Sequence, residues 1–207
     1  LFGPRVIVGV PSGITSVEVR AVRDAAYNAG ARDVYIVEEP MAAAIGIGLP
    51  VNDPTGSMVV DIGGGTTDIG VASLGGLVNA RNVKIAGDRF NSDIVSYIRS
   101  EFKGLPREIV VTDSDVREAI AHSIEQLIDS IKEVLETTPP EVVSDILKRG
   151  IYLAGGGALI RELPRLLQEE LGVPVHVAED PLTAVVRGTG RILDDVEAYK
   201  EAFIHHD

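Results

Sequence analysis

The sequence of 207 residues contains no cysteine and no tryptophan, and aromatic residues make up only 4% of it. The absence of cysteine excludes disulfide bonds and thiolate metal sites. A core with so few aromatic rings has to be built from valine, isoleucine, leucine and alanine, as buried parallel sheets usually are. With 45% hydrophobic and 24% charged residues, the composition is that of a globular protein with one substantial domain or two small ones.

Positive charge is also scarce, because 19 lysine and arginine residues face 31 aspartate and glutamate residues and the formal net charge is −12. This balance argues against a nucleic acid as partner, since binding its phosphate backbone requires a positive field. It does not argue against ATP. Backbone N–H groups and Mg²⁺ can hold a nucleotide without a basic patch.

The sequence has no signal peptide and no apolar run of the length that a membrane span needs. We therefore expect a cytoplasmic chain that does not insert into a membrane by itself. It starts directly with a predicted strand and without an initiator methionine, which indicates a piece of a longer protein.

Strand and helix signals alternate along the first half of the chain. Residues 5–10 form a β-branched run before the turn Pro11-Ser12-Gly13. Thr15 and Glu18 have the spacing of a capping box, which predicts a helix over residues 16–29. The further expected elements are a strand over 33–38, a short helix over 41–48, strands over 58–62, 68–73 and 76–85, and a helix over 89–102.

Helices dominate the second half. Asp113 or Ser114 is expected to cap a long helix whose apolar face consists of Val116, Ile120, Ile124, Leu127, Ile131 and Leu135. The other expected elements are strands over 108–112, 150–153 and 173–177, helices over 141–149, 159–170 and 181–193, and a polar tail that frays after Asp194. This order predicts an α/β fold with a mixed, mostly parallel sheet and helices on both faces.

The strongest functional signal is the segment Asp61-Ile62-Gly63-Gly64-Gly65-Thr66-Thr67-Asp68 between two predicted strands. Its glycines allow positive φ and let the backbone approach a ligand without a Cβ atom in the way. Successive N–H groups in such a turn form an anion site, and the hydroxyls of Thr66 and Thr67 add donors. Asp61 can hold Mg²⁺ through waters. A ligand-free hairpin is the other interpretation, but Asn-Gly or Asp-Gly serves an ordinary hairpin, so we favour phosphate binding.

A second glycine-rich turn, Gly155-Gly156-Gly157 followed by Ala158, joins a predicted strand to a predicted helix. The helix N-terminus and bare backbone then face a common point that accepts a base or the neighbouring phosphates. Such turns are also common packing devices. Two glycine-rich turns in one chain favour the nucleotide interpretation more than either turn alone.

Carboxylates at two element boundaries are further candidates. Glu39, fixed by the following Pro40, either orients a water against a γ-phosphate or is an acidic residue favoured by the helix dipole, and spacing alone leaves both open. Asp88 follows Gly87 at a helix start, and we interpret it first as a cap and second as a ligand contact. No histidine has the spacing of a metal ligand, and Ser12 lacks the flanking pattern of a nucleophile elbow.

Five segments of the chain form a recognisable set: residues 10–15, 38–46, 61–68, 154–160 and 179–184. Together they closely resemble the MreB family of bacterial actin-like cell-shape proteins, and more broadly the superfamily of actin, sugar kinases and DnaK-type chaperones. The resemblance covers essentially the whole chain in order. Chaperone relatives are expected to carry Asn-Glu-Pro-Thr where this chain has Glu38-Glu39-Pro40-Met41.

The resemblance implies an actin-like (ribonuclease H-like) fold with a mixed sheet of about five strands, and ATP and Mg²⁺ as cofactors. By the same resemblance, Glu39 orients the attacking water with help from Thr66, and Asp61 lies on the Mg²⁺ side. The nucleotide contacts that it implies are Gly63, Gly64, Gly65, Thr66 and Thr67 for the phosphates, Gly155, Gly156, Gly157 and Ala158 for the adenosine side, and Gly87 and Asp88.

Members of this family hydrolyse ATP as they polymerise into double filaments on the inner membrane surface, where they organise lateral cell-wall growth. The resemblance therefore implies self-association and cell-wall elongation membrane proteins as partners for a full-length parent. A DnaK-type chaperone ATPase and a sugar-kinase-like nucleotide-binding domain are the alternatives. The first needs a substrate-binding domain after the tail, and the second needs residues for an acceptor site that this chain does not supply.

The chain also departs from the family pattern. In the family, a whole first domain precedes this segment and a small subdomain IIB is inserted before the stretch Gly104-Leu105-Pro106-Arg107. We therefore expect residues 1–195 to be subdomain IIA with a splice near 102–107, and 196–207 to be a polar tail. Asp68 stands where many relatives have glutamate, which is not expected to alter phosphate binding. Since half of a cleft leaves ATP solvated, we expect weak binding and negligible hydrolysis.

Overall fold

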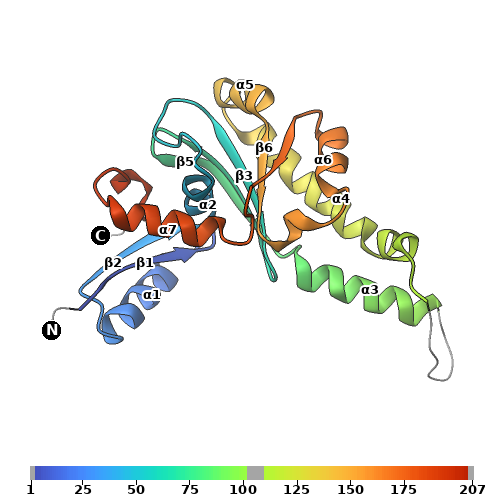
Figure 1. Ribbon diagram of the computed structural model, residues 1–207, viewed down its shortest axis with the longest axis horizontal. Coiled ribbons are helices and arrows are strands. Elements are labelled where there is room, and N and C mark those ends of the chain that lie inside the picture. Colours follow the sequence, from blue (N-terminus) through green and yellow to red (C-terminus); the bar gives the residue numbers. More distant parts are fainter. Residues whose placement is uncertain (1–2, 102–109, 205–207) are drawn as a thin grey trace.

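A mixed sheet of five strands forms the centre of the molecule (Figure 1). The computed structural model describes residues 3–101 and 110–204. The strand order is β5-β4-β3-β6-β7, and both sequence neighbours of β4 pair with it in antiparallel fashion, whereas β6 and β7 run parallel to β3. The predicted mixed sheet is thereby confirmed. Its strands are β3 (Ser57–Ile62), β4 (Thr67–Ser73), β5 (Gly76–Val83), β6 (Ile151–Ala154) and β7 (Val175–Val177).

Helices cover both faces of this sheet, as predicted. Side chains alternate along β3, so Met58 and Val60 pack in one hydrophobic cluster while Val59 packs in another. The first face carries α3 (Gly87–Glu101), α4 (Asp113–Thr137), α5 (Pro140–Arg149) and α6 (Leu163–Leu171), and the second carries α2 (Glu39–Ile47) and α7 (Ala184–Asp194).

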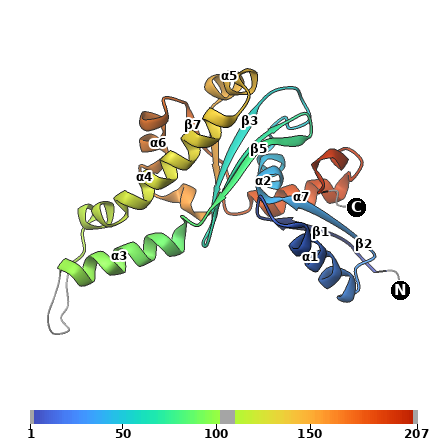
Figure 2. The ribbon, with the colours of Figure 1, turned by 180° about the vertical axis from the view of Figure 1, so that it is seen from behind.

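The first two strands do not join the five-stranded sheet. β1 (Arg5–Val10) and β2 (Asp33–Glu38) form a parallel pair of their own, connected by α1 (Ser16–Asn28) and held by a third, small hydrophobic cluster. Figures 1 and 2 show this unit beside the five-stranded sheet, with α2 and α7 between the two. Local sequence signals locate both strands, but the alternation of strands and helices does not specify which sheet a strand joins.

Helices α2 and α7 cross at very close range because small residues meet at the crossing. A Cβ atom built on Gly46 would overlap the backbone of Ala184, and one built on Gly188 would overlap the backbone of Ala42. Each helix thus presents an alanine and a glycine four residues apart on one face. The Arg191 guanidinium adds a hydrogen bond of 2.5 Å to the carbonyl oxygen of Ile45.

Helices α3 and α4 pack side by side and extend well beyond the sheet (Figures 1 and 2). The N-cap of α4 is Thr112, which forms a capping box with Asp115, so the expected cap at Asp113 or Ser114 is wrong by one or two residues. The β-branched residues 110–112 form no strand because no neighbouring strand pairs with them. Residues 108 and 109, and the expected splice near 102–107, lie outside the described residues.

One predicted helix is divided into two in the structure. The helix expected over 159–170 is divided into η1 (Gly156–Leu159) and α6, because Pro164 in the first turn of α6 favours a new helix start.

At 25 residues, α4 is the longest helix. In the described part of the chain, no helix is both long enough and apolar enough to span a bilayer.

The C-terminal tail packs on β2 instead of fraying. After η2 (Lys200–Ala202), Phe203 forms an antiparallel bridge with Val37, and its ring lies 5.0 Å from that of Tyr35, centroid to centroid. The N–H of Ile204 donates a hydrogen bond of 2.9 Å to the carbonyl oxygen of Ile36. The tail therefore covers the edge of β2 that β1 leaves open, up to the last described residue.

Candidate functional site

The glycine-rich turn between β3 and β4 meets the start of α3 at one end of the five-stranded sheet. Gly63 donates its N–H to the carbonyl oxygen of Thr66 at 3.0 Å, which closes the turn. The N–H groups of Gly87 and Asp88 donate to the carbonyl oxygens of Gly63 and Gly64 at 3.2 and 2.8 Å. Helix α3 thus begins directly on the turn, with Asp88 in its first turn rather than at its cap.

The three consecutive glycines do not have the backbone conformation that the sequence argument assumed. None of Gly63, Gly64 and Gly65 has a positive φ, so the expectation of left-handed backbone is wrong here. No atom lies within 4 Å of a Cβ built on Gly64, and the nearest atom to one built on Gly65 is a carboxylate oxygen of Asp88 at 3.9 Å. Gly64 and Gly65 therefore leave the surface of the turn bare rather than relieve strain.

The two threonines of the turn differ in their surroundings. Thr67 is fully buried, and its hydroxyl donates a hydrogen bond of 2.6 Å to the carbonyl oxygen of Ile85. Its side chain therefore lies beneath the turn and is not available to a phosphate, which corrects the role predicted for that hydroxyl. Thr66 is half-buried at the turn, so the hydroxyl role remains a prediction for Thr66 alone.

The second glycine-rich turn packs tightly on β3. Gly155 has a φ of +76°, and a Cβ atom there would overlap the carbonyl oxygen of Ile62. A Cβ atom on Gly157 would overlap the Ile62 side chain, and Ala158 is itself buried in the core. Packing thus explains Gly155, Gly157 and Ala158, whereas Gly156 is exposed. Of this predicted group, Gly156 is the residue whose surface a ligand reaches most directly.

A hollow of about 530 Å³ opens between the two turns, within the size range of small-molecule sites. Val116 and Ile120, at the start of the predicted apolar face of α4, both line this hollow, and Ile120 also packs against the core. The apolar wall was therefore not foreseen as part of a site. The full lining is Gly63, Gly64, Gly87, Phe90, Asn91, Ile94, Val116, Ile120, Gly156, Gly157, Ile160 and Leu182.

Three carboxylates gather where β3 ends. Asp61 pairs with Asp68 across the β3–β4 ladder, and Glu39 is the first residue of α2. Burial, reinforced by the negative charges of Glu39 and Asp68, raises the pKa of Asp61 to about 7. Burial and the charge of Asp68 also raise the pKa of Glu39. The site therefore concentrates negative charge that a cation would relieve.

The chemistry of these donors fits a hydrated Mg²⁺. Within the described residues, Glu39, Asp61 and Asp68 take part in no ion pair with lysine or arginine. The same part of the chain contains no group of three or more carboxylates and imidazoles placed to enclose a metal ion. Mg²⁺ usually keeps several waters and takes one or two carboxylates together with phosphate oxygens. Asp61 fits that kind of site.

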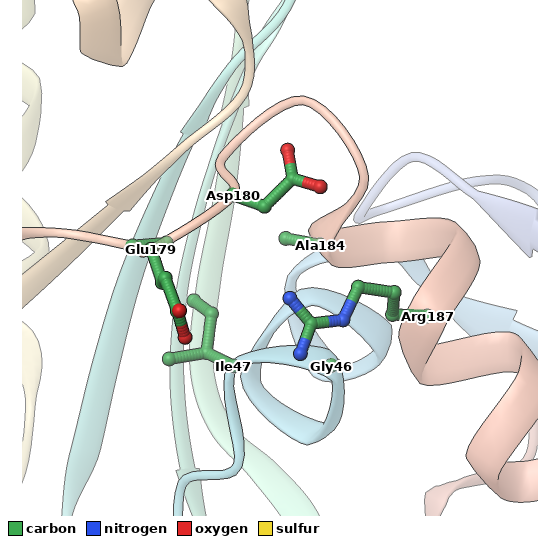
Figure 3. A pocket seen from close by; sticks show the side chains of 7 residues that line it. Gly46, Ile47, Glu179, Asp180, Ala184 and Arg187 are labelled. Carbon is green, nitrogen blue, oxygen red and sulfur yellow. The ribbon is translucent and has the colours of Figure 1, made fainter.

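A second hollow lies between the end of α2 and the loop before α7 (Figure 3). Gly46, Ile47, Glu179, Asp180 and Arg187 are among its lining residues, and Figure 3 shows the Arg187 side chain extending over Gly46. Its volume of about 30 Å³ corresponds to a single water. It cannot hold a nucleotide and lies outside the candidate site.

Comparison with known sequences identifies the family. The sequence model of the MreB/Mbl protein family matches residues 1–103 and 101–201. The cell shape-determining protein MreB of Escherichia coli is 44% identical over 232 aligned positions, which cover 95% of this chain and 67% of that protein. The cell shape-determining protein Mbl of Bacillus subtilis is 42% identical, over 94% of this chain and 69% of that protein.

Solved structures have the same fold. MreB5 of Spiroplasma citri bound to ADP superposes with a TM-score of 0.89 and 33% identity, over 95% of this chain and 71% of that one. The same protein bound to AMPPNP gives an equal TM-score. The MamK double helical filament, at 22% identity, shares the fold with a TM-score of 0.76. This chain belongs to the MreB/Mbl family of cell shape-determining, actin-like proteins.

Proposed function

We propose that this chain forms one wall of the Mg·ATP site of an MreB-type protein. The observation that carries the proposal is the hollow between the two glycine-rich turns, next to a carboxylate cluster that has no basic partner among the described residues. The phosphates would lie on the bare surface of Gly64 and Gly65, and the base and ribose would enter the apolar part of the hollow. The ADP and AMPPNP bound to the related MreB5 support a nucleotide as the ligand.

Asp61, Glu39 and Thr66 would have different roles in ATP hydrolysis. Asp61 would hold Mg²⁺ through waters, which neutralises phosphate charge and positions the γ-phosphate. Glu39 would orient the attacking water, and its raised pKa suits a group that takes up a proton. The Thr66 hydroxyl would assist Glu39. Gly87 and Asp88 lie against the turn through their N–H groups and would stabilise it rather than contact the phosphates first.

This wall alone should bind ATP weakly and hydrolyse it negligibly, because the phosphates would stay in contact with water on one side. Two observations support a shortened site. The alignment with Escherichia coli MreB runs over 232 positions whereas this chain has 207 residues, so that protein carries residues without a counterpart here. The family match divides into two segments that meet at residues 101–103, which supports the expected splice near 102–107 within subdomain IIA.

In a full-length parent, the site would couple ATP hydrolysis to self-association into filaments. Such filaments would lie in the cytoplasm at the inner face of the membrane and organise cell-wall elongation together with membrane proteins of that machinery. The family membership supports this wider role.

Titration with Mg·ATP followed by amide chemical shifts and by calorimetry tests the proposal. We expect saturable shifts at the two turns with an affinity weaker than micromolar. Gly64→Ala should keep the fold and weaken binding by about ten-fold or more, because the added methyl group occupies the surface where a phosphate would lie. Gly76→Ala is the matched control. It also adds a Cβ in open space, but at the β4–β5 turn, which lies at the end of β4 opposite to Gly64.

Each outcome decides part of the proposal. A micromolar dissociation constant would contradict the expected weakness. Unchanged shifts at both turns at millimolar Mg·ATP, or equal binding by Gly64→Ala and wild type, would contradict the site itself.

A further inference from the structure

The segment between β5 and α3 runs along the first glycine-rich turn. The hydroxyl of Thr67 donates a hydrogen bond of 2.6 Å to the carbonyl oxygen of Ile85. Farther along, the N–H of Gly87 donates a hydrogen bond of 3.2 Å to the carbonyl oxygen of Gly63. Lys84 directly precedes these contacts in the chain, so its backbone is held next to the turn.

The direction of the Lys84 side chain follows from its neighbours. Ile85 packs against the hydrophobic cluster on the face of the sheet that α3 and α4 cover. Asn82 points to the other face, where its amide donates a hydrogen bond of 2.8 Å to Asp68. Since side chains alternate along an extended chain, Lys84 shares the face of Asn82. Asp61 is on this face as well, because it lies opposite Asp68 in the β3–β4 ladder.

Lys84 is exposed and has no carboxylate partner. Within the described residues it takes part in no ion pair, although Asp61 and Asp68 lie on the same face of the sheet. A lysine whose role was to neutralise these carboxylates would pair with one of them. The lysine ammonium group is a compact charge on a flexible stem of four carbons, so it can reach a ligand at the turn.

The two ends of the turn differ in their surroundings. Gly63 and Gly64 line the hollow in which the base and ribose would lie, whereas Lys84 does not. Continued by one residue beyond its last pair, the β4–β5 register places Lys84 opposite Thr66, at the other end of the turn. A phosphate chain that leaves the hollow along the bare surface of the turn therefore ends beside Lys84.

We propose that Lys84 binds the terminal phosphate of the nucleotide, so that this wall prefers a nucleoside triphosphate over nucleotides with fewer phosphates. Lysine binds phosphate as a point charge, and here it would add a positive side chain to a site that otherwise offers backbone N–H groups and carboxylates. The inference rests on the proposed nucleotide site and adds to it a residue outside both glycine-rich turns.

Amide chemical-shift titrations with Mg·ATP, Mg·ADP and AMP measure this preference. The wild type should bind ATP more tightly than AMP. Lys84→Gln keeps a polar side chain but removes the charge, and it should weaken ATP binding about five-fold, because water screens an exposed charge contact. AMP lacks the terminal phosphates and should bind to both proteins equally. Lys84→Arg keeps the charge and should keep most of the preference for ATP.

Lys148→Gln is the matched control. Lys148 is also exposed and takes part in no ion pair within the described residues. It lies on α5 just before β6 begins, at the end of the sheet opposite to the turn. This variant should leave the affinities for all three nucleotides unchanged.

The outcomes separate the role of Lys84 from the site itself. Equal ATP affinity of Lys84→Gln and wild type would overturn the role of Lys84 and leave the nucleotide site standing. An equal loss of affinity for ATP, ADP and AMP would also overturn it, because the substitution would then disturb the turn rather than a contact to the terminal phosphate. If no nucleotide shifts the wild-type amides at either turn, both the site and this inference are wrong.

Discussion

At the scale of single residues, the main feature is the unneutralised charge around Asp61. A hairpin position opposite Asp68 and a neighbouring Glu39 place one carboxylate where burial and like charges both disfavour ionisation. A structural carboxylate of this depth would normally have a basic partner, and within the described residues this one has none. Such a group destabilises the ligand-free fold in return for a cation site.

We expect Asp61→Asn to stabilise the ligand-free protein at neutral and alkaline pH. Unfolded Asp61 loses its proton near 3.8 and folded Asp61 near 7, so the folded state binds more protons in between. The stability of the wild type therefore falls as pH rises from about 4 to about 7, by at most about 4 kcal/mol from this group. The variant lacks that loss, so its advantage should be small near pH 4 and complete above pH 7.

Denaturant unfolding of both proteins across this pH range measures the difference. Asp129→Asn, at an exposed position of α4, is the control and should show no such pH-dependent gain. A difference between Asp61→Asn and wild type that stays constant over the range would contradict the raised pKa.

At the scale of elements, the crossing of α2 and α7 decides how the two units sit together. The sequence signal is only a pair of small residues four apart on each helix, alanine and glycine in both cases. Small residues let two helix backbones approach closely, and the resulting contact has no side chains that can adjust. The crossing should therefore be intolerant of a single added methyl group.

Gly188→Ala should lower the free energy of unfolding by at least about 2 kcal/mol, because the new Cβ would overlap the backbone of Ala42. Gly190→Ala lies in the same helix with nothing within 4 Å of its Cβ position. That control should raise stability by about 0.5–1 kcal/mol through the lower entropy of its unfolded chain. Chemical denaturation of both variants checks the pair. Equal effects of the two substitutions would show that the close crossing is not what limits this position.

At the scale of the whole molecule, the C-terminal tail closes the small two-stranded unit. A two-stranded sheet is marginal by itself, and an open strand edge invites pairing with other chains. The bridge from Phe203 to Val37 and the bond from Ile204 to Ile36 cover one edge of this unit with residues from the opposite end of the chain. Completion of this unit thus depends on contacts between segments that lie far apart in the sequence.

Phe203→Ala should destabilise the protein by about 1–2 kcal/mol. The substitution removes a half-buried ring that packs against Tyr35 and against the hydrophobic cluster formed around α2. Amide hydrogen exchange should speed up along β2 while β3 stays protected, since the loss is local to one unit. Glu197→Ala, exposed in the same tail, should leave both measurements unchanged. Equal acceleration in β2 and β3 would mean that the tail stabilises the molecule globally instead.

Local chemistry made much of the fold predictable. The capping box of Thr15 and Glu18 starts α1 at Ser16, and the β-branched run of β2 has the predicted limits Asp33 and Glu38. The two residues of such a box contact each other within one turn, so the sequence contains the whole interaction. The strand expected over 108–112 was wrong at Val110–Thr112 for the opposite reason, because a strand needs a partner that the local sequence does not describe.

By itself, the sequence determined the α/β class, the location of most elements, the two glycine-rich turns and the family resemblance, since each rests on residues that are neighbours in the chain. Only the tertiary structure decided what joins distant segments. It separated β1 and β2 from the five-stranded sheet, placed the tail on β2, assigned Gly155 and Gly157 to packing on Ile62 and brought Asp68 into hydrogen-bond contact with Ser12. The physical reason is that burial and hydrogen bonding act between atoms that are close in space, and one sequence without its fold does not state which distant residues those are.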